Sequence, residues 1–326
     1  MAEGKKLSLA ACLILVICLL MAGCGEKERT GFSGSGFFYE GVDSTGKTVT
    51  LQTRPEKIVL LAPSFLGIMH AVGGDFSAWA NSPVTEVPAY ARGKPTVGFL
   101  YQVNLESVIA VRPDLVIGMN GLHNGLADTL EQNKIPVMIL NMSNYEDVVN
   151  ALHIMGDATG HHREAALAIE NLSQNMKKME EAVPKNHLTA AILHGTARTV
   201  TIERTGTIAS ETAGMLGFDN VFAHMADEKS GKMPPFSMEA LAVADPDVIF
   251  LTSMGLPGQA EAAFKKVLMD QPAWASMKAV REGRVYFLPQ TLFLSNPGMD
   301  YPLALQYMAH QVYPDIVPWN EKEITE

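Results

Sequence analysis

The sequence predicts an α/β protein in which two similar lobes, each with a central parallel sheet, are joined by a single long helix. Short aliphatic runs alternate with helical patterns through both halves of the chain, as expected for parallel strands covered on both faces. One helix–turn–strand segment occurs twice, and a long amphipathic pattern separates the two copies. We therefore expect an N-terminal lobe at 57–158, an interlobe helix at 159–184 and a C-terminal lobe at 185–326.

Residues 1–23 have the layout of a secretory signal peptide. Lys5 and Lys6 precede an almost wholly apolar run that ends at Ala22. This run is too short and too close to the N-terminus to be a good membrane span. The sequence therefore predicts an exported protein.

The residues around Cys24 resemble a bacterial lipobox, in which the cysteine is lipidated and becomes the mature N-terminus. Met21 stands where leucine is usual, and the alternatives are a plain signal peptide or an uncleaved anchor. We favour a lipoprotein because a polar tether with Gly and Ser follows the cysteine. Residues 24–56 are then the lipidated tether and a first strand, and the lipid anchors the protein to the extracytoplasmic side of the membrane.

Cysteine content and charge narrow the possible functions. Cys12 and Cys18 lie in the leader, so the exported chain has no disulfide and depends on its core for stability. The net charge of −10 argues against nucleic acid as a partner. Roughly 300 residues remain after the leader, which suffices for one bilobed domain or two ordinary ones. We expect a monomer.

The elements of the two lobes follow the same order. The first lobe begins with strand KIVLLA and helix FLGIMHAVG, and after a polar loop it continues with the helix that carries Glu106, strand LVIG, helix NGLADTLEQN and strand PVMIL. The second lobe has strand TAAILHG, helix ASETAGMLG, the helix that carries Glu239, strand DVIFLT, helix AEAAFKKVLM and strand RVYFLP.

A single amphipathic helix is predicted between the lobes. Pro184 ends the pattern. A rigid connection of this kind limits hinge bending, because no flexible crossover absorbs large dihedral changes. The apolar residues recur at spacings of three and four, so they share one face of the helix. They are Ala165, Ile169, Leu172, Met176, Met179 and Val183.

The duplicated segment reads NLESVIAVRPDLVIG from Asn104 and SMEALAVADPDVIFL from Ser237. Each copy carries a glutamate in the first turn of its helix and a Pro-Asp pair before its strand. The two copies keep a constant offset of 133 positions, which aligns Glu106 with Glu239, Pro113 with Pro246 and Asp114 with Asp247.

These segments, together with DSTGKTVTL, PEKIVLLAPS and AVREGRVYFLP in this order and spacing, resemble the class III substrate-binding proteins of ABC importers. The resemblance covers essentially the whole mature chain. That family carries ferric siderophores, haem and cobalamin, so the resemblance implies capture of an iron complex between two lobes and delivery to a membrane permease and its ATPase. Phe65 and Leu66 stand where the family often has Thr-Glu, a departure that puts apolar residues near the cleft.

The resemblance also implies a role for the duplicated glutamates. Each lobe of such a protein presents one exposed glutamate to arginines of the membrane subunits, and Glu106 and Glu239 stand at the matching positions. Two carboxylates on one rigid body fix orientation and speed association. The alternative is that each only stabilises the N-terminal turn of its helix. We favour docking, because that stabilisation alone does not require equivalent positions, and both roles can hold at once.

The ligand is expected between the lobes, outside the carboxyl ends of the strands. The loops at this place are apolar and aromatic with a few donors, which suits a large, flat or chelated ligand better than a bare metal ion or a sugar. The candidate ligand-binding residues are Phe65, Phe99, Tyr101, Met119, His123, His194, Arg198, Met254 and Phe293.

Tyr101 and Met254 are the candidates for a metal ligand. Haem carriers of the family usually ligate iron with Tyr, His or Met from these loops. Phe99 occupies the position of a ligand tyrosine in several of them, so Tyr101 lies two residues beyond it. The alternatives are that Tyr101 is an aromatic wall, which we favour, and that Met254 is ordinary packing. Lone histidines such as His123 and His194 are more often structural groups.

Charge narrows the cargo further. Arg92 and Arg198 are the only arginines expected near the cleft, which argues against a strongly anionic triscatecholate. A neutral hydroxamate siderophore, haem, and a corrinoid such as cobalamin stay open, and an oxyanion of the molybdate type is a further alternative. Any such chelate is cargo, and no permanently bound cofactor is expected.

No enzyme is predicted. The sequence contains no glycine-rich phosphate loop, no Gly-x-Ser-x-Gly and no His-Glu-x-x-His, and lipidation removes Cys24 as a nucleophile. A non-transport surface lipoprotein is the alternative from another class, although such a protein does not need two aligned lobes with an aromatic crevice.

Overall fold

The computed structural model describes residues 36–196, 199–224, 236–254, 262, 264–295 and 297–319. The predicted leader, the lipidation site Cys24 and the candidate ligand residue Arg198 lie outside these ranges.

A six-stranded sheet forms the centre of the N-terminal lobe, in the order β6-β5-β4-β3-β7-β8. The strands are almost entirely buried in its middle, because helices cover both faces, and this explains their near-continuous aliphatic sequences. All pairs are parallel except β5–β6. The strands are β3 (Ile58–Leu60), β4 (Ala78–Asn81), β5 (Thr96–Phe99), β6 (Gln102–Val103), β7 (Leu115–Met119) and β8 (Val137–Leu140).

Alternate residues of these strands face two different cores. Ile58 and Leu60 pack with α2 (Ser64–Ala71) and α5 (Tyr145–Thr159). Val59 packs on the opposite face with α3 (Leu105–Val111) and α4 (Asn124–Gln132). The period of two along each strand therefore divides the lobe into two hydrophobic layers.

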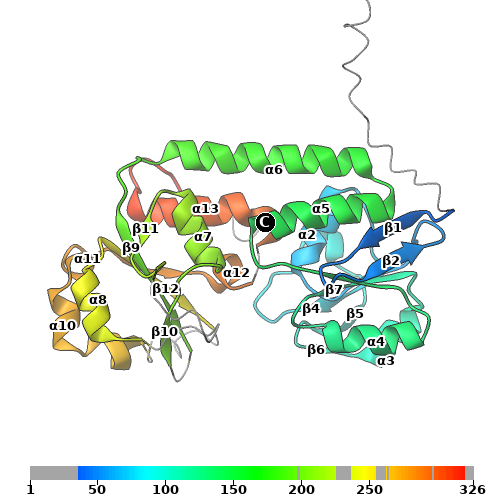
Figure 1. Ribbon diagram of the computed structural model, residues 1–326, viewed down its shortest axis with the longest axis horizontal. Helices are drawn as coiled ribbons and strands as arrows, with labels where there is room; N and C mark the ends of the chain where they lie inside the picture. Colours follow the sequence, from blue (N-terminus) through cyan, green and yellow to red (C-terminus); the bar gives the residue numbers. More distant parts are fainter. Residues whose placement is uncertain are drawn as a thin grey trace, which may run out of the picture. The chain divides into compact units, whose positions relative to one another are not determined.

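β1 (Tyr39–Val42) and β2 (Thr48–Leu51) form a separate hairpin (Figure 1), and its turn hydrogen-bonds to the free edge of β8. Ser44 N–H donates to the carbonyl of Ile139 at 2.8 Å, and Ile139 N–H donates to Asp43 Oδ2 at 3.1 Å. These bonds satisfy edge groups that would otherwise be open to another strand.

A five-stranded sheet forms the centre of the C-terminal lobe. Its main order is β10-β9-β12-β13, with β11 also paired to β9. Only β10 is antiparallel to its neighbour. The strands are β9 (Thr189–Gly195), β10 (Val200–Ile202), β11 (Asp219–Asn220), β12 (Val248–Ser253) and β13 (Val285–Leu288).

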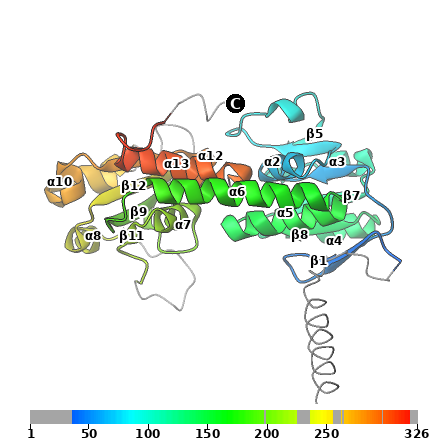
Figure 2. The ribbon, with the colours of Figure 1, turned by 90° about the horizontal axis from the view of Figure 1, so that it is seen from above.

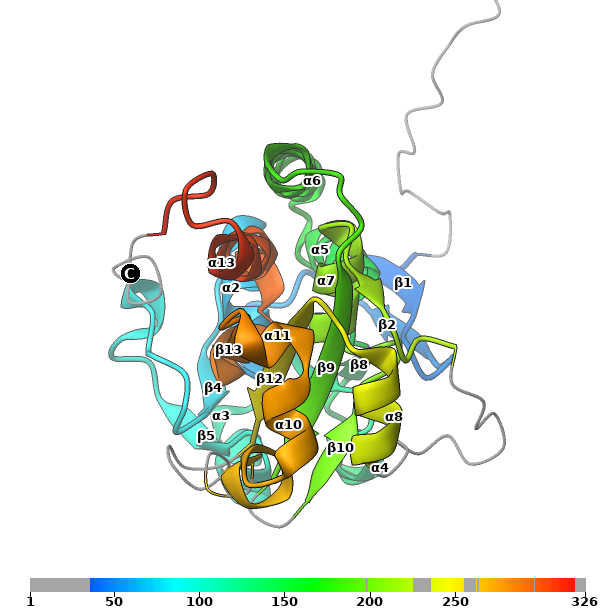
Figure 3. The ribbon, with the colours of Figure 1, turned by 90° about the vertical axis from the view of Figure 1, so that its left-hand side faces the viewer.

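Helices cover both faces of this sheet as well (Figure 3). One face packs against α7 (Ile208–Met215), α12 (Gln290–Phe293) and α13 (Tyr301–Val312). The other packs against α8 (Met238–Ala244), the π-helix η2 (Lys265–Met269), α10 (Pro272–Ser276) and α11 (Lys278–Arg281). Two short 3-10 helices complete the described elements, η1 (Ala89–Ala91) and η3 (Gly298–Asp300).

The predicted connecting helix is α6 (His162–Ala182), and it packs against α5 and α13, one helix from each lobe (Figures 1 and 2). Ala165, Leu172 and Met176 are buried, as their spacing predicts. One face of each sheet joins α6 in a single continuous core. The predicted fold class of two parallel-sheet lobes with one long connecting helix is confirmed.

The duplicated segment has the same local structure in both lobes. The side chain of Asn104 accepts a bond from Ser107 N–H at the start of α3, and Ser237 accepts one from Ala240 N–H at the start of α8. Such caps satisfy backbone donors that the helix leaves free. Both helices then end in the left-handed region at non-glycine residues, Arg112 with φ 52° and Asp245 with φ 36°.

Candidate functional site

The turn between β5 and β6 carries two exposed aromatic rings in the N-terminal lobe. Phe99 is 52% exposed and Tyr101 73%. Gly98 makes this turn possible, because its φ is +101° and a Cβ there would lie 2.5 Å from the carbonyl oxygen of Gln102. A glycine at this place therefore fixes where both rings are presented.

His123 holds the same turn in place through a hydrogen bond to Leu100. Its Nδ1 accepts a bond from Met119 N–H at 3.0 Å, so its Nε2 carries the proton and donates to the carbonyl of Leu100 at 2.9 Å. Burial lowers the pKa of His123, and the bond to Leu100 offsets this only in part. His123 is buried and neutral with both nitrogens satisfied, so its geometry supports the turn rather than offering a free group to a ligand.

Two of the candidate ligand residues lie in the core. Phe65 on α2 and Phe293 on α12 are at most 1% exposed and belong to the continuous core between the lobes. Both were predicted to line the cleft because they follow strands. Position in the chain does not show which way a ring points. Met119, at the end of β7, is half-buried against the same core.

Met254 and His194 lie together at the ends of two neighbouring strands in the C-terminal lobe. Met254 follows β12 and is 47% exposed, and its N–H donates to the carbonyl of Gly195 at 3.1 Å. His194 precedes Gly195 and pairs in register with Thr252. The structure thus brings together one group of candidates around the Phe99–Tyr101 turn and another around His194, and no hydrogen bond among the described residues joins the two groups.

A buried polar cluster lies beneath His194. Glu203 is 1% exposed, and its carboxylate accepts bonds from the hydroxyls of Thr252 and Thr207. The Nδ1 atom of His194 lies 3.0 Å from the Thr252 hydroxyl and 3.7 Å from Glu203 Oε1. Sequence reasoning missed Glu203 and Thr252; the available signal was a glutamate directly after the apolar run VTI.

The duplicated glutamates are both exposed in the first turns of their helices. Glu106 stands on α3 and Glu239 on α8, and Ser237 Oγ donates to Glu239 Oε2 at 3.1 Å. A carboxylate there interacts favourably with the free N–H groups of the helix start. Both carboxylates are nonetheless open to solvent and to a partner.

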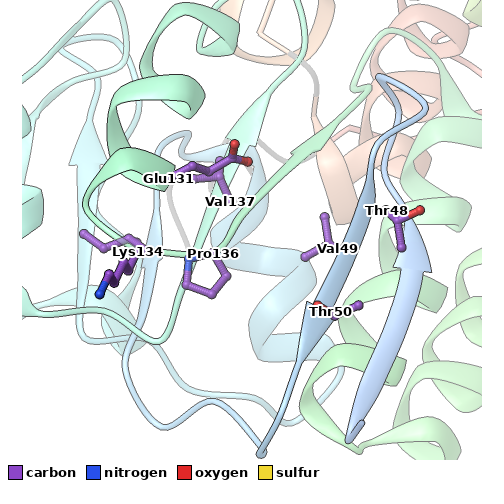
Figure 4. Close-up of a pocket in the computed structure, with 8 residues that line it drawn as sticks. Thr48, Val49, Thr50, Glu131, Lys134, Pro136 and Val137 are labelled. Atoms are coloured by element: carbon purple, nitrogen blue, oxygen red, sulfur yellow. The ribbon is translucent and has the colours of Figure 1, made fainter. Parts of the chain in front are cut away.

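Two hollows on the described surface are not lined by any candidate ligand residue. The smaller, of about 240 Å³, lies between β2 and residues 131–137, with Val49 and Pro136 on its two sides (Figure 4). The larger, of about 660 Å³, surrounds the start of α7 and is lined by polar groups that include Asn144, Arg204 and Glu211.

Two further properties bear on the site. Among the described residues, no three or more His, Cys, Asp or Glu side chains come together in a way that could hold a metal ion. A metal carried in a chelate, which brings its own ligands, needs no such cluster. The helices within the described ranges include none that is long and apolar enough to cross a membrane.

Known proteins match this chain over most of its length. Residues 58–292 match the family described as periplasmic binding protein. The chain is 24% identical over 326 residues to the uncharacterized ABC transporter substrate-binding lipoprotein YvrC of Bacillus subtilis (strain 168), which covers 95% of this chain and 98% of that protein. It is 27% identical over 247 residues to the Fe(3+) dicitrate-binding periplasmic protein FecB of Escherichia coli (strain K12), covering 73% and 78%.

A solved structure extends this comparison to the fold. IsdE of S. aureus in complex with haem superposes with a TM-score of 0.67 at 18% identity, covering 79% of this chain and 98% of that chain. At this identity the likeness establishes a shared fold.

Proposed function

The chain belongs to the periplasmic binding protein family, and we propose that it is the extracytoplasmic substrate-binding protein of an ABC importer that captures an iron complex, either a ferric siderophore or haem. On this proposal it is not an enzyme. It is anchored by lipid at Cys24, binds the complex between its lobes, and delivers it to a membrane permease and its ATPase.

The observation that carries the proposal is the pair of equivalent helices α3 and α8, each with an exposed glutamate in its first turn. One such residue on each lobe, on a body held together by α6 and one continuous core, supplies two fixed anionic points for a membrane partner. Charge-assisted contacts at two separated points determine orientation better than one contact does.

The exposed residues near the strand ends support a chelate as cargo. Phe99, Tyr101 and Met254 are large apolar side chains with roughly half or more of their surface open to solvent. An apolar and aromatic surface with few charged groups suits a flat or apolar-rimmed ligand. The named cargoes of relatives, ferric dicitrate for FecB and haem for IsdE, are both iron chelates, and haem is the one of the two that is flat and apolar-rimmed. Cobalamin is the second candidate, because a corrinoid also presents a broad, partly apolar face around a metal.

A thermal-shift panel tests this function. The mature protein is melted alone and with ferric citrate, a ferric hydroxamate siderophore, ferric haem, hydroxocobalamin or molybdate. Ligand that binds only the folded state stabilises it by about 2.7 kcal/mol at one hundred times its Kd. We expect one of the iron chelates to raise the Tm. A rise with hydroxocobalamin or molybdate alone would replace the proposed cargo, and no rise with any probe would contradict a role as carrier of these ligands.

A further inference from the structure

The two exposed rings on the β5–β6 turn are placed by one peptide unit, which joins Leu100 to Tyr101. Leu100 N–H donates to the carbonyl of Asn81 at the end of β4 at 2.7 Å, and the carbonyl of Leu100 accepts from His123 Nε2 at 2.9 Å. Because a peptide unit is planar, the direction of this carbonyl fixes the direction of the Tyr101 N–H. Leu100 is therefore held from two sides, while its neighbours Phe99 and Tyr101 are open to solvent.

The ring of His123 can make its two bonds in one protonation state only. Its Nδ1 accepts from Met119 N–H at 3.0 Å, and a backbone N–H cannot accept in return. The carbonyl of Leu100 cannot donate, so Nε2 must carry the proton. Both partners thus require the same neutral tautomer. A second proton, on Nδ1, would point at the N–H of Met119 and break that bond.

A glycine makes room for this histidine. A Cβ at Gly118 would lie 3.0 Å from the Cβ of His123 and 2.9 Å from Cδ1 of Ile139, which is closer than such atoms normally come. The N–H of His123 also donates to the carbonyl of Met119 at 2.9 Å. The ring is fixed against the end of β7 and is buried, so it acts on the turn and does not contact a ligand.

We propose that His123 is a positioning residue for the cargo, and that its neutral ring holds the Leu100 carbonyl so that Phe99 and Tyr101 are in place before a ligand arrives. This rests on the proposed function, because it concerns the aromatic surface that the cargo would cover. Rings that are already held in place reduce the ordering cost that a flexible turn adds to binding. His123 contributes to affinity in this way.

A second proton on His123 should release the turn. Burial lowers the pKa of His123, and the bond to Leu100 offsets this only in part, so the neutral form persists to a lower pH than in an ordinary histidine. The elements packed against the ring are the turn itself, β7, β8 and α4. β7 and β8 carry no titratable side chain, and the others carry Tyr101, Asp128 and Glu131. Affinity for the cargo should therefore be constant near neutral pH and fall in acid.

The first test uses the ligand-free protein and two substitutions that separate the two bonds. The amide of asparagine lies near the Nδ1 position, so His123→Asn keeps an acceptor for Met119 and loses the donor to Leu100. Glutamine reaches the Nε2 position, so His123→Gln keeps the donor and loses the acceptor. Backbone ¹⁵N relaxation should show greater motion at residues 99–102 in His123→Asn than in the original chain, and little change in His123→Gln. Motion that is unchanged in His123→Asn, or raised equally in both variants, would overturn the positioning role.

The second test measures affinity with ferric citrate, a ferric hydroxamate siderophore and ferric haem as probes. The Kd of a probe that binds the original chain should rise about tenfold in His123→Asn, because a buried carbonyl loses its partner and the turn is no longer held. The Kd in His123→Gln should stay near that of the original chain. The control is His310→Ala, which removes a 2.8 Å bond to the carbonyl of Val317 in the C-terminal lobe. It should lower the Tm without changing the Kd.

The pH profile of the Kd separates positioning from a purely structural role. Between pH 4 and pH 8 the Kd of the original chain should rise in acid, below about pH 6.5, and His123→Gln should lack this additional rise. Comparing the two chains with the same probe at each pH cancels the acid sensitivity of the probe. Identical profiles, or a His123→Asn variant with a lower Tm and an unchanged Kd, would show that His123 is structural only.

The outcomes also separate this proposal from the proposed function. If a probe binds the original chain and all variants alike, positioning by His123 is wrong and the carrier function stands. If no probe binds the original chain, the carrier function is wrong, and this proposal is wrong with it.

Discussion

The hydroxyl of Tyr301 donates a 3.0 Å hydrogen bond to the carboxylate of Glu211, and the N–H of Tyr145 donates to the same oxygen at 3.1 Å. Glu211 belongs to α7 and Tyr301 begins α13 in the C-terminal lobe, whereas Tyr145 begins α5 in the N-terminal lobe. The rings of Tyr145 and Tyr301 also meet edge to face, with centroids 5.7 Å apart. One carboxylate thus links three helices across both lobes, and it lies beside the continuous core.

Glu211 should give the stability of the protein a distinctive pH dependence. Burial raises the pKa of its carboxyl, hydrogen bonds from Tyr145 and Tyr301 oppose this, and the charges of Asp147 and Glu146 raise it further. The folded state then binds the proton more tightly than the unfolded state, so this group adds stability as pH falls through its folded pKa and penalises folding while it is ionised at neutral pH.

Glu211→Gln tests this dependence, because glutamine keeps an acceptor oxygen without the charge. We expect the free energy of unfolding of the variant, relative to the original chain, to be highest near pH 7 and to decline toward pH 4. The change should stay below about 1 kcal/mol, because the group is only partly buried and solvent partly screens its charge. Urea unfolding at pH 4–8 measures it. A difference that is flat across this range, or that grows in acid, would contradict the assignment.

The repeated aspartates should differ in their contribution to stability. Asp114 Oδ2 accepts from the N–H groups of Glu56 and Lys57, and Asp247 Oδ2 accepts from the N–H and hydroxyl of Thr189. We expect Asp247→Ala to cost about 1–2 kcal/mol, since Thr189 is half-buried and its N–H and hydroxyl proton both lose their acceptor. Asp114→Ala should cost less, because Glu56 and Lys57 are exposed and water replaces the lost acceptor. Urea unfolding of both variants compares them.

The pH dependence of the Asp247→Ala cost provides a control for this comparison of the two aspartates. Burial acts to raise the pKa of Asp247, but hydrogen bonds from Lys278 and Thr189 outweigh it and hold the pKa below its usual range. A lowered folded pKa means that the stabilisation is present above the unfolded pKa and is lost as pH falls through the folded one. The cost of Asp247→Ala should therefore shrink below about pH 4. A cost that persists unchanged at pH 2 would show that the ionised carboxylate is not responsible.

The sequence was sufficient to predict the duplicated framework, because its signals are local. Aliphatic runs, a helix period from Ala165 to Val183 and the Pro-Asp pairs each reflect residues close in the chain. The short strands β4 and β5 and the fifteen-residue helix α5 (Tyr145–Thr159) were missed. β4 reads AWAN and carries no run of branched residues, and the mixed surface of α5 hides its buried stripe.

The site was less predictable, since side-chain direction depends on the tertiary structure. Phe65 and Phe99 both follow or end a strand, yet the first is fully buried and the second is half exposed. His123 and His194 are both single histidines in loops or strand ends, and only the structure shows that His123 bonds two backbone groups whereas His194 lies against the hydroxyl of Thr252. Glu203 comes one strand turn after His194, and the two could be placed together only once the pairing of β9 with β10 was known.

If Glu106 and Glu239 dock the protein to its permease, they should be needed for transport and not for ligand affinity. Reversing both Glu106 and Glu239 to Lys should abolish uptake of the identified chelate by cells, because the two anionic contacts with the permease become repulsive. The affinity of the purified variant for the chelate should stay nearly unchanged, as both side chains are exposed on helices outside the candidate ligand groups.

The matched control reverses Glu170 and Glu181 on the exposed face of α6, which changes net charge equally. This variant should transport normally. Uptake that survives the Glu106 and Glu239 reversal would leave only the helix-dipole role, and affinity that collapses with it would place the two residues in the ligand site.

Membrane attachment should depend on Cys24 alone. Cys24→Ser removes the proposed site of the acyl chain, so the protein should move to the soluble fraction of cells that express it. Cell fractionation followed by a salt wash and immunoblotting measures this. A variant that stays with the washed membranes would show that an uncleaved apolar segment, and not lipid, holds the protein there.

The exposed side chains at the strand ends should carry much of the affinity for the cargo. Truncating Phe99, Tyr101 or Met254 to Ala should each weaken binding by roughly 1–3 kcal/mol, because each removes large apolar contact area that is already held in place. Because these side chains are exposed in the ligand-free protein, its Tm should change little. Ile316→Ala, at a residue 53% exposed in the C-terminal segment, is the control and should leave affinity intact.

The visible spectrum of the complex separates two roles for Tyr101 and Met254. If the side chain of Tyr101 or Met254 ligates the metal, its removal changes the spectrum as well as the affinity. If Tyr101 and Met254 are only walls of the site, the spectrum keeps its shape in both variants while the affinity falls. A chelate that binds equally well to all three truncated variants would show that the cargo sits elsewhere, and the exposed rings beside Gly98 would then need another partner.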